Sequence, residues 1–297
     1  MGFDPAWLTA RRRYDEAALD AAAVEAIRDW GTALPTGYAP VVVDLGSGTG
    51  AALRRARAWL AGRPMRAYAV DRDAALLALT GPGNDRKQSR MHHTEPAVRA
   101  PHTTRILGDL LEPLDGLGGP ADGTVDLVLG HALADLLPLD RLASRVAALA
   151  RPGGLIHLAL AYDGETTFGP SLAAIAPDLA ENERAILGLF HQHMDRPRTA
   201  CPDYGGATSG RRLAPALQAA GLEIVRDAPS VWQVAAADGP DGGLVLDWLL
   251  QFVADAAREL GELDREAVGA WEACRRAMLA CGTLTARVGH CDVLAQR

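Results

Sequence analysis

The sequence predicts an α/β fold built on a doubly wound, mostly parallel sheet. Two observations support this: apolar runs alternate with helical periodicity between residues 41 and 161, and glycines directly follow the first apolar run. The chain has 297 residues, of which 48% are hydrophobic, so it can bury a large core. Disordered, collagen-like and disulfide-stapled chains are therefore excluded.

The residues before the first strand should form a helical cover. Apolar residues recur at helical spacings between residues 4 and 30, interrupted by three arginines at 11–13, which predicts one or two amphipathic helices. Pro35 and Pro40 end this region. We expect a helical cover over residues 1–38 and the main domain over residues 39–297.

The central part of the chain alternates strands and helices, which implies right-handed crossovers. Strands are expected at 41–45, 66–71, 104–107, 124–130 and 154–161, and helices at 49–61, 73–79 and 138–150. The run Val41-Val42-Val43 is typical of a strand buried on both faces. Residues 81–102 contain three prolines and two glycines without periodicity, so a surface loop is expected there.

The pattern is less regular beyond the fifth strand. Helices are expected at 179–193, 210–220, 243–260 and 264–281, a loop at 195–208, and strands at 222–227 and 284–294. We interpret the two helices after residue 243 as an insertion between the last two strands. Helical insertions at about 164–208 and 238–282 would then cover the sheet.

Charge and cysteine usage limit the partners. Thirty basic and 37 acidic residues give a net charge of −7, which disfavours nucleic acid. No apolar stretch approaches 18 residues without a charge, proline or glycine, so no membrane span is expected. Four cysteines without CxxC spacing, together with the absence of a signal peptide, predict a cytoplasmic protein. We expect it to be a monomer or a homodimer.

A glycine loop follows the first strand, in the segment Val41-Val42-Val43-Asp44-Leu45-Gly46-Ser47-Gly48-Thr49-Gly50. Glycines let the backbone approach a ligand, and the N-terminus of the following helix favours an anionic group. The loop alone is ambiguous, because Gly46-x-Gly48-x-x-Ala51 also matches a loose dinucleotide fingerprint.

Three further features distinguish these alternatives. Asp44 lies two residues before the first glycine, where a carboxylate can accept from a ligand ammonium or brace the loop but repels a pyrophosphate. Asp71 ends the second strand, where an acceptor meets a ribose diol. Gly108-Asp109-Leu110 follows the third strand, where an adenine amino group could donate, although Asp109 could also cap the next segment.

These motifs together resemble the class I S-adenosylmethionine-dependent methyltransferases over about residues 41–162. Asp44-x-Gly46-x-Gly48-x-Gly50 is similar to the family's first motif, Asp71 to its ribose-binding acid and Gly108-Asp109 to its adenine motif. Residues 125–131 are similar to its fourth strand, and Ala150-Arg151-Pro152-Gly153-Gly154 departs from the usual LxPGG only at its first position.

The resemblance implies a Rossmann-like sheet of seven strands with an antiparallel last strand, and S-adenosylmethionine as methyl donor with S-adenosylhomocysteine as product. Several related small-molecule enzymes fold an N-terminal helix over the cofactor, so Arg11 could pair with the methionyl carboxylate and Tyr14 could close the pocket. The residues expected to bind the cofactor are Arg11, Tyr14, Asp44, Gly46, Ser47, Gly48, Gly50, Asp71, Arg72, Gly108, Asp109, Leu110, Gly130 and His131.

Two residues are candidates for proton removal from the acceptor. His131 ends the fourth strand and titrates near working pH, although it could equally pack over the cofactor. Tyr162 follows the fifth strand. The family's nucleic-acid-base subclass often carries Asn/Asp-Pro-Pro-aromatic here, whereas this chain has Gly130-His131-Ala132-Leu133, so that subclass is disfavoured.

A polar segment after the fifth strand is expected to contact a small-molecule acceptor. Its candidate residues are His191, His193, Asp195 and Arg198. His191 and His193 also suggest a metal site, with Cys201 as a further ligand. Two residues two positions apart do not share a helix face, however, so no metal is expected.

The leading hypothesis is therefore an enzyme that methylates an oxygen or nitrogen of a small metabolite or biosynthetic intermediate. One alternative is an NAD(P)-dependent oxidoreductase using the glycine loop and Asp71, but it leaves Asp44 and Gly108-Asp109 unexplained. Another is a non-catalytic partner subunit that retains the fold.

Overall fold

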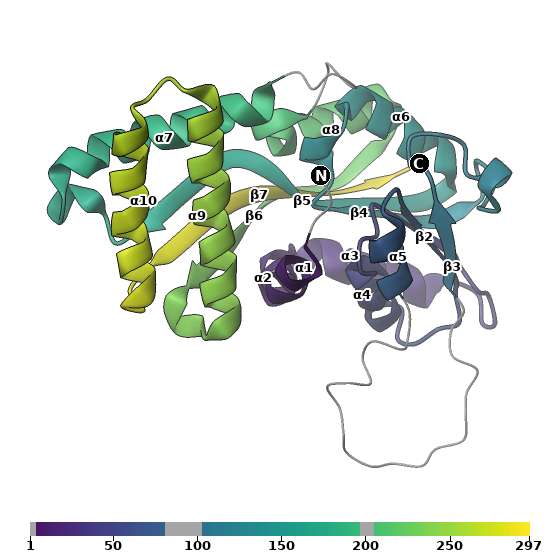
Figure 1. Ribbon diagram of the computed structural model, residues 1–297. Coiled ribbons are helices and arrows are strands. Elements are labelled where there is room, and N and C mark those ends of the chain that lie inside the picture. Colours follow the sequence, from purple (N-terminus) through teal and green to yellow (C-terminus); the bar gives the residue numbers. More distant parts are fainter. Residues whose placement is uncertain (1–3, 81–102, 197–204) are drawn as a thin grey trace, which may run out of the picture.

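A seven-stranded sheet forms the centre of the computed structural model, which describes residues 4–80, 103–196 and 205–297 (Figure 1). The strand order is β3-β2-β1-β4-β5-β7-β6. The strands are β1 (Val41–Leu45), β2 (Arg66–Asp71), β3 (Thr103–Leu107), β4 (Val125–His131), β5 (Ala150–Gly169), β6 (Glu223–Ala235) and β7 (Thr285–Gln296). Strands β1 to β5 pair in parallel, and β7 is antiparallel to both of its neighbours. The predicted fold class is confirmed.

Helices cover the sheet. They are α1 (Pro5–Ala10), α2 (Arg12–Ala18), α3 (Ala21–Ala33), α4 (Ala51–Trp59), α5 (Ala74–Leu79), α6 (Leu139–Leu149), α7 (Pro177–Asp195), α8 (Ser209–Ala219), α9 (Pro240–Leu260) and α10 (Arg265–Ala280). Single 3-10 turns lie at 115–117, 134–136, 172–174, 206–208 and 236–238. Among the described residues, none of these helices is both long and apolar enough to cross a membrane.

The N-terminal region contains three helices, where the sequence predicted one or two. The side chain of Asp4 accepts a hydrogen bond from the first turn of α1, and the side chain of Asp20 does the same for α3. Between them, Leu19 has an extended backbone that ends α2. The helical region is therefore divided at two places, near Arg11 and near Leu19. The apolar residues keep a helical spacing across both places, so periodicity alone cannot reveal the divisions.

Strands β5 and β6 are much longer than predicted, which corrects the expected end of β5 at residue 161 and of β6 at residue 227. Residues 164–169 were expected to begin a helical insertion, but they belong to β5, and residues 166–169 pair with the first residues of β7, as in Thr166 with Val288. Register shifts on either side of Ala161 and Tyr162 break the alternation of side chains. A polar stretch can be a strand here because its hydrogen-bond partners come from a segment far along the chain.

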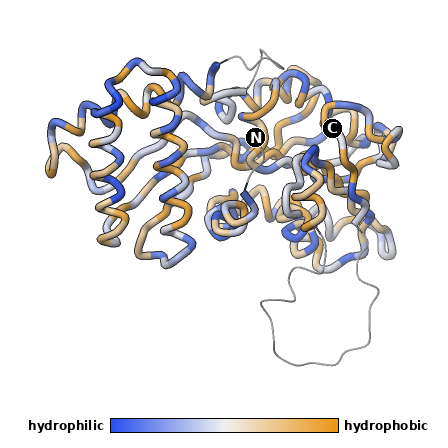
Figure 2. The backbone as a smooth tube through the Cα atoms, in the orientation of Figure 1, coloured by the Kyte–Doolittle hydropathy of each residue, from blue (hydrophilic) through white to orange (hydrophobic). Residues whose placement is uncertain are grey.

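The long ends of β5, β7 and β6 support a second hydrophobic core beside the parallel part of the sheet. This core contains Trp7 of α1, Ile186 of α7, Leu250 of α9, Trp271 of α10 and Trp232 of β6. Helices α7, α9 and α10 gather at this end of the molecule (Figure 1). Polar and apolar segments alternate along α9 and α10, as expected of helices with one buried face (Figure 2).

The parallel part of the sheet defines where a ligand can bind. All five residues of β1 are buried, because helices cover both faces of this strand. The strand order reverses between β1 and β4, since β2 lies on one side of β1 and β4 on the other. In open α/β sheets, ligands bind at the carboxyl ends of the strands at this switch point. The predicted loop at 81–102, as well as Arg198 and Cys201, lie outside the described residues.

Candidate functional site

A cavity of about 490 Å³ opens at the carboxyl ends of β1, β2, β3 and β4. It is lined by Leu8, Arg11, Gly46, Gly48, Asp71, Arg72, Asp73, Ala74, Ala75, Leu76, Gly108, Asp109, Leu110, His131, Ala132, Leu133, Leu136 and Leu137. The N-terminal segment, the glycine loop and the ends of three further strands thus meet around one space. Its volume is in the range of sites for small molecules and cofactors.

The glycine loop lies along one wall of this cavity. Gly46 has a φ of +66°, and a Cβ built on it would lie 2.8 Å from Cδ1 of Leu133, so a side chain there is both strained and obstructed. Gly50 has a φ of +78° and forms the N-cap of α4. The backbone of the loop therefore lies close to the cavity, and the loop ends at the N-terminus of α4.

Asp71 joins the glycine loop to the end of β2. Its Oδ2 accepts a hydrogen bond from the backbone N–H of Gly48 at 2.8 Å, and its Oδ1 accepts from that of Asp73 at 3.0 Å. A carboxylate has about four acceptor sites, so two remain for a ligand in the cavity that Asp71 lines. Asp109 follows β3, the strand that pairs with β2; it is exposed and accepts from the N–H of Leu111 at 2.9 Å.

Asp44 is buried at the end of β1, with 1% of its surface exposed. Its Oδ2 and the hydroxyl of the neighbouring Ser47 have no hydrogen-bond partner among the described residues. Burial raises the pKa of Asp44 to about 7, against the lowering effects of Ser47 and the Arg55 charge. A buried polar oxygen without a partner is costly, and Asp44 Oδ2 lies behind the glycine loop, outside the cavity lining.

Asp44 should make the ligand-free protein less stable as pH rises. Its pKa in the folded protein, about 7, lies above its ordinary value of 3.8, so the folded state binds the proton more tightly than the unfolded chain. The free energy of unfolding should therefore fall between about pH 4 and pH 7. Asp44→Asn should flatten this fall and raise the melting temperature at pH 8, measured by calorimetry.

Asp126 provides a matched control for that experiment. It is equally buried, but it accepts hydrogen bonds from Tyr38 and from the N–H of Val41, and it pairs with Arg151 at 2.5 Å. Asp126→Asn should lower the melting temperature at pH 8, because it weakens satisfied contacts. Equal destabilisation by both substitutions would contradict the interpretation of Asp44.

His131 lies at the end of β4 and has contacts at both ring nitrogens. Its Nδ1 lies 3.0 Å from Nη1 of Arg55, and its Nε2 lies 3.1 Å from Nδ1 of His157. Arg55 can only donate, so Nδ1 of His131 accepts and Nε2 carries the proton. Burial, followed by the charges of His157, Arg55 and Arg11, lowers the pKa of His131 well below its ordinary value. His131 is therefore neutral, and its lone pair is engaged by Arg55.

Arg11 and Tyr14 differ in their position. Arg11 lines the cavity, pairs with Asp15 at 3.5 Å and has its guanidinium carbon 5.6 Å from the centroid of the Trp232 ring. Tyr14 is buried and does not line the cavity. Its hydroxyl donates to Oδ2 of Asp238 at 3.0 Å, next to α9.

Of the candidate acceptor residues, the three that the structure describes, His191, His193 and Asp195, contact neighbouring elements and do not line this cavity, and neither does Tyr162. The hydroxyl of Tyr162 lies 2.8 Å from both Oγ1 of Thr166 and Nε2 of His191, and burial raises its pKa. His193 lies 2.8 Å from Oε2 of Glu259.

Asp195, the next of the candidate acceptor residues, accepts from the N–H of Ala207 at 2.7 Å. The structure thus gives His191 and His193 separate partners, on β5 and on α9. Within the described ranges, no three His, Cys, Asp or Glu residues are grouped to hold a metal ion.

The structure brings together many of the residues expected to bind a cofactor. Those lining the cavity are Arg11, Gly46, Gly48, Asp71, Arg72, Gly108, Asp109, Leu110 and His131. Tyr14, Asp44, Ser47, Gly50 and Gly130 lie outside the lining. The sequence did not predict that residues 73–76 line the cavity, nor that Ala132, Leu133, Leu136 and Leu137 form one of its walls. Their only signal is that they directly follow β2 and β4, at the edge where ligands bind.

The strand order and the position of this cavity define the class I methyltransferase fold. A solved candidate type II methyltransferase from Anaeromyxobacter dehalogenans has a TM-score of 0.51 and 18% identity, over 92% of this chain and 95% of its own. A candidate methyltransferase from Bacillus halodurans has a TM-score of 0.51 and 12% identity, over 93% and 99%. No protein-family model and no curated protein matches the chain.

Proposed function

We propose that the chain is an S-adenosylmethionine-dependent methyltransferase that methylates an oxygen or nitrogen of a small molecule and releases S-adenosylhomocysteine. One observation carries this proposal: a single cavity combines the glycine loop, the acid Asp71 that ends β2 and the Gly108-Asp109 turn after β3. The buried, unpaired oxygen of Asp44 lies at the base of the same loop.

Four side chains account for the polar groups of the cofactor. Asp71 would accept from the ribose hydroxyls, and Asp109 would accept from the adenine amino group. Asp44 would pair with the methionyl ammonium, whose positive charge stabilises the ionised carboxylate. Arg11 would exchange part of its contact with Asp15 for the methionyl carboxylate. The cofactor supplies an electrophilic methyl group on sulfur, and the protein supplies binding and orientation.

The chain's own residues then position the reactants and exclude water. Leu8, Leu133 and Leu136 present apolar side chains to the cavity, so an acceptor there is held in a dry environment. His131 would act as a positioning residue in this proposal, because Arg55 occupies the lone pair that a general base needs. Tyr162 would stay protonated, since burial raises its pKa.

Calorimetric titration with S-adenosylhomocysteine and, separately, with NADH tests the proposed function. We expect S-adenosylhomocysteine to bind and NADH to give no heat, because the pyrophosphate would lie beside the Asp44 carboxylate. The oxidoreductase alternative rests on Gly46-x-Gly48-x-x-Ala51 and predicts the reverse. Tight binding of NADH without binding of S-adenosylhomocysteine would overturn the proposal.

A further inference from the structure

Trp232 of β6 and His290 of β7 form a buried pair of aromatic rings with unsatisfied polar atoms. Their ring centroids are 4.9 Å apart, and 4% and 5% of the two residues are exposed. Nε1 of Trp232 and Nδ1 of His290 are both buried without a hydrogen-bond partner. Native proteins leave few buried polar atoms unpaired, and such atoms often mark a functional role. Each ring of the pair therefore has one buried nitrogen that lacks a polar partner among the described residues.

Only one layer of side chains separates this pair from the cofactor cavity. Helix α1 contributes Leu8 to the cavity lining, whereas its Trp7 lies edge-on to Trp232 with ring centroids 6.1 Å apart. Arg11 follows α1 and lines the cavity, and its guanidinium carbon lies 6.0 Å from the Trp7 ring centroid and 5.6 Å from that of Trp232. Burial, followed by the Arg11 charge, lowers the pKa of His290 to about 3, so the imidazole is neutral. The pair therefore offers a neutral binding surface beside the cofactor.

We propose that Trp232 and His290 bind a hydroxyl oxygen of the methyl acceptor, and that this acceptor is a flat aromatic molecule of the phenol class. This inference rests on the methyltransferase function proposed above. A hydroxyl accepts from the N–H of Trp232, and it suits Nδ1 of His290 in either tautomer because it both donates and accepts. The acceptor ring would replace the Trp7 indole against Trp232, so α1 must move when the acceptor enters.

The surroundings of the pair favour an uncharged or anionic ring over other acceptors. Trp7 and Trp232 present apolar faces and edges, against which a flat ring packs well. Arg11 places a positive charge next to the pair, which disfavours an ammonium group. A long flexible polar acceptor would leave this apolar surface without matching contacts.

Phenol is the probe for the test, with toluene as the same ring lacking the hydroxyl. The protein is saturated with S-adenosylhomocysteine, and the Kd of each probe is measured by ligand-observed NMR. Trp232→Phe removes the indole N–H, His290→Phe removes both imidazole nitrogens, and both keep an aromatic ring. Each should raise the Kd of phenol about three- to tenfold, the loss expected for one hydrogen bond. The Kd of toluene should stay unchanged.

Trp248→Phe is the matched control. Trp248 packs against Trp7 and Phe252, at centroid distances of 6.1 and 5.4 Å, but it does not touch the pair. This variant should bind phenol like the unaltered protein. Melting temperatures of all variants show whether each one folds, and either Trp232→Phe or His290→Phe suffices for the comparison.

The outcomes separate this inference from the proposed function. Calorimetry on the same samples reads S-adenosylhomocysteine binding, and its absence overturns the proposed function. If S-adenosylhomocysteine binds but phenol does not, or if phenol binds all variants equally, the inference alone is overturned. A selective loss of phenol affinity in the two variants of the pair supports it.

Discussion

Asp71→Ala should weaken binding of S-adenosylhomocysteine by about 5- to 150-fold, corresponding to roughly 1–3 kcal/mol. The substitution removes the acceptors that we propose for the two ribose hydroxyls. It also releases the N–H of Gly48, which now donates to Asp71 Oδ2 at 2.8 Å, and that of Asp73. The glycine loop would therefore lose a contact that holds it in the conformation seen in the structure. Isothermal titration calorimetry measures the Kd directly.

Asp178→Ala is the control, since Asp178 is an exposed acid in the first turn of α7 and does not line the cavity. It should leave the Kd unchanged. An unaltered Kd for Asp71→Ala would remove Asp71 from the binding site. If Asp71→Ala also lowered the melting temperature of the ligand-free protein by more than a few degrees, the affinity loss would be attributed partly to the loop.

The parallel half of the sheet could be predicted because the residue pattern of each strand shows whether its two faces are buried. Val41-Val42-Val43 is apolar without alternation, as a strand buried on both faces requires, and the structure places β1 there. The second half of β5 could not be predicted in this way. Residues 164–169 have only one apolar side chain, that of Phe168, and they continue the strand because residues 285–288 pair with residues 166–169. Contacts that distant along the chain have no local signature.

The candidate site shows the same division. The places of Asp71, Gly46 and Gly48 in the cavity lining could be predicted because residues at the end of a parallel strand face the ligand-binding edge of the sheet. The surroundings of His131 could not, because Arg55 lies on α4 and His157 on β5, and only the fold brings them to its two nitrogens. The unpaired atoms of Asp44, Trp232 and His290 are likewise a property of packing.

Arg275→Met should lower the free energy of unfolding by about 3–5 kcal/mol, since it breaks a buried ion pair. Arg275 of α10 is fully buried and forms two hydrogen bonds of 2.7 Å with the carboxylate of Glu183 on α7. It also donates to the carbonyls of Pro170 and Phe168 at the end of β5. Trp271 donates to the same carboxylate. One guanidinium thus joins α7, α10 and β5, and its removal leaves the carboxylate with the Trp271 donor alone and takes the Arg275 donor from two carbonyls.

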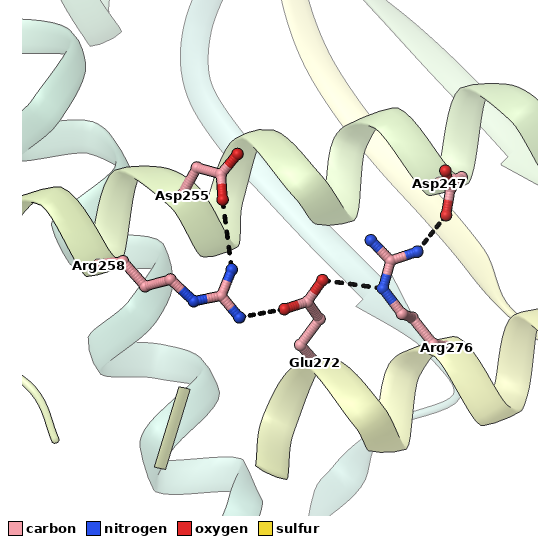
Figure 3. A network of polar contacts seen from close by, with 5 residues as sticks. All are labelled: Asp247, Asp255, Arg258, Glu272 and Arg276. Carbon is pink, nitrogen blue, oxygen red and sulfur yellow. Dashed lines mark hydrogen bonds and ion pairs between the residues drawn. The ribbon is translucent and has the colours of Figure 1, made fainter. Parts of the chain in front are cut away.

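Substitution of the neighbouring Arg276 is the control that shows how much of the loss comes from burial of the Arg275 ion pair and how much from loss of a positive charge. Arg276 carries the same guanidinium on the same helix, but it is partly exposed and pairs with Glu272 and Asp247 at the surface between α9 and α10 (Figure 3). Arg276→Met should cost less than about 1 kcal/mol, because water screens exposed ion pairs. Urea unfolding of both variants gives the two values. Similar losses of unfolding free energy for Arg275→Met and Arg276→Met would contradict this interpretation. They would show that the buried contacts of Arg275 do not stabilise the packing of α7 and α10 against the end of β5 more than the surface ion pairs do.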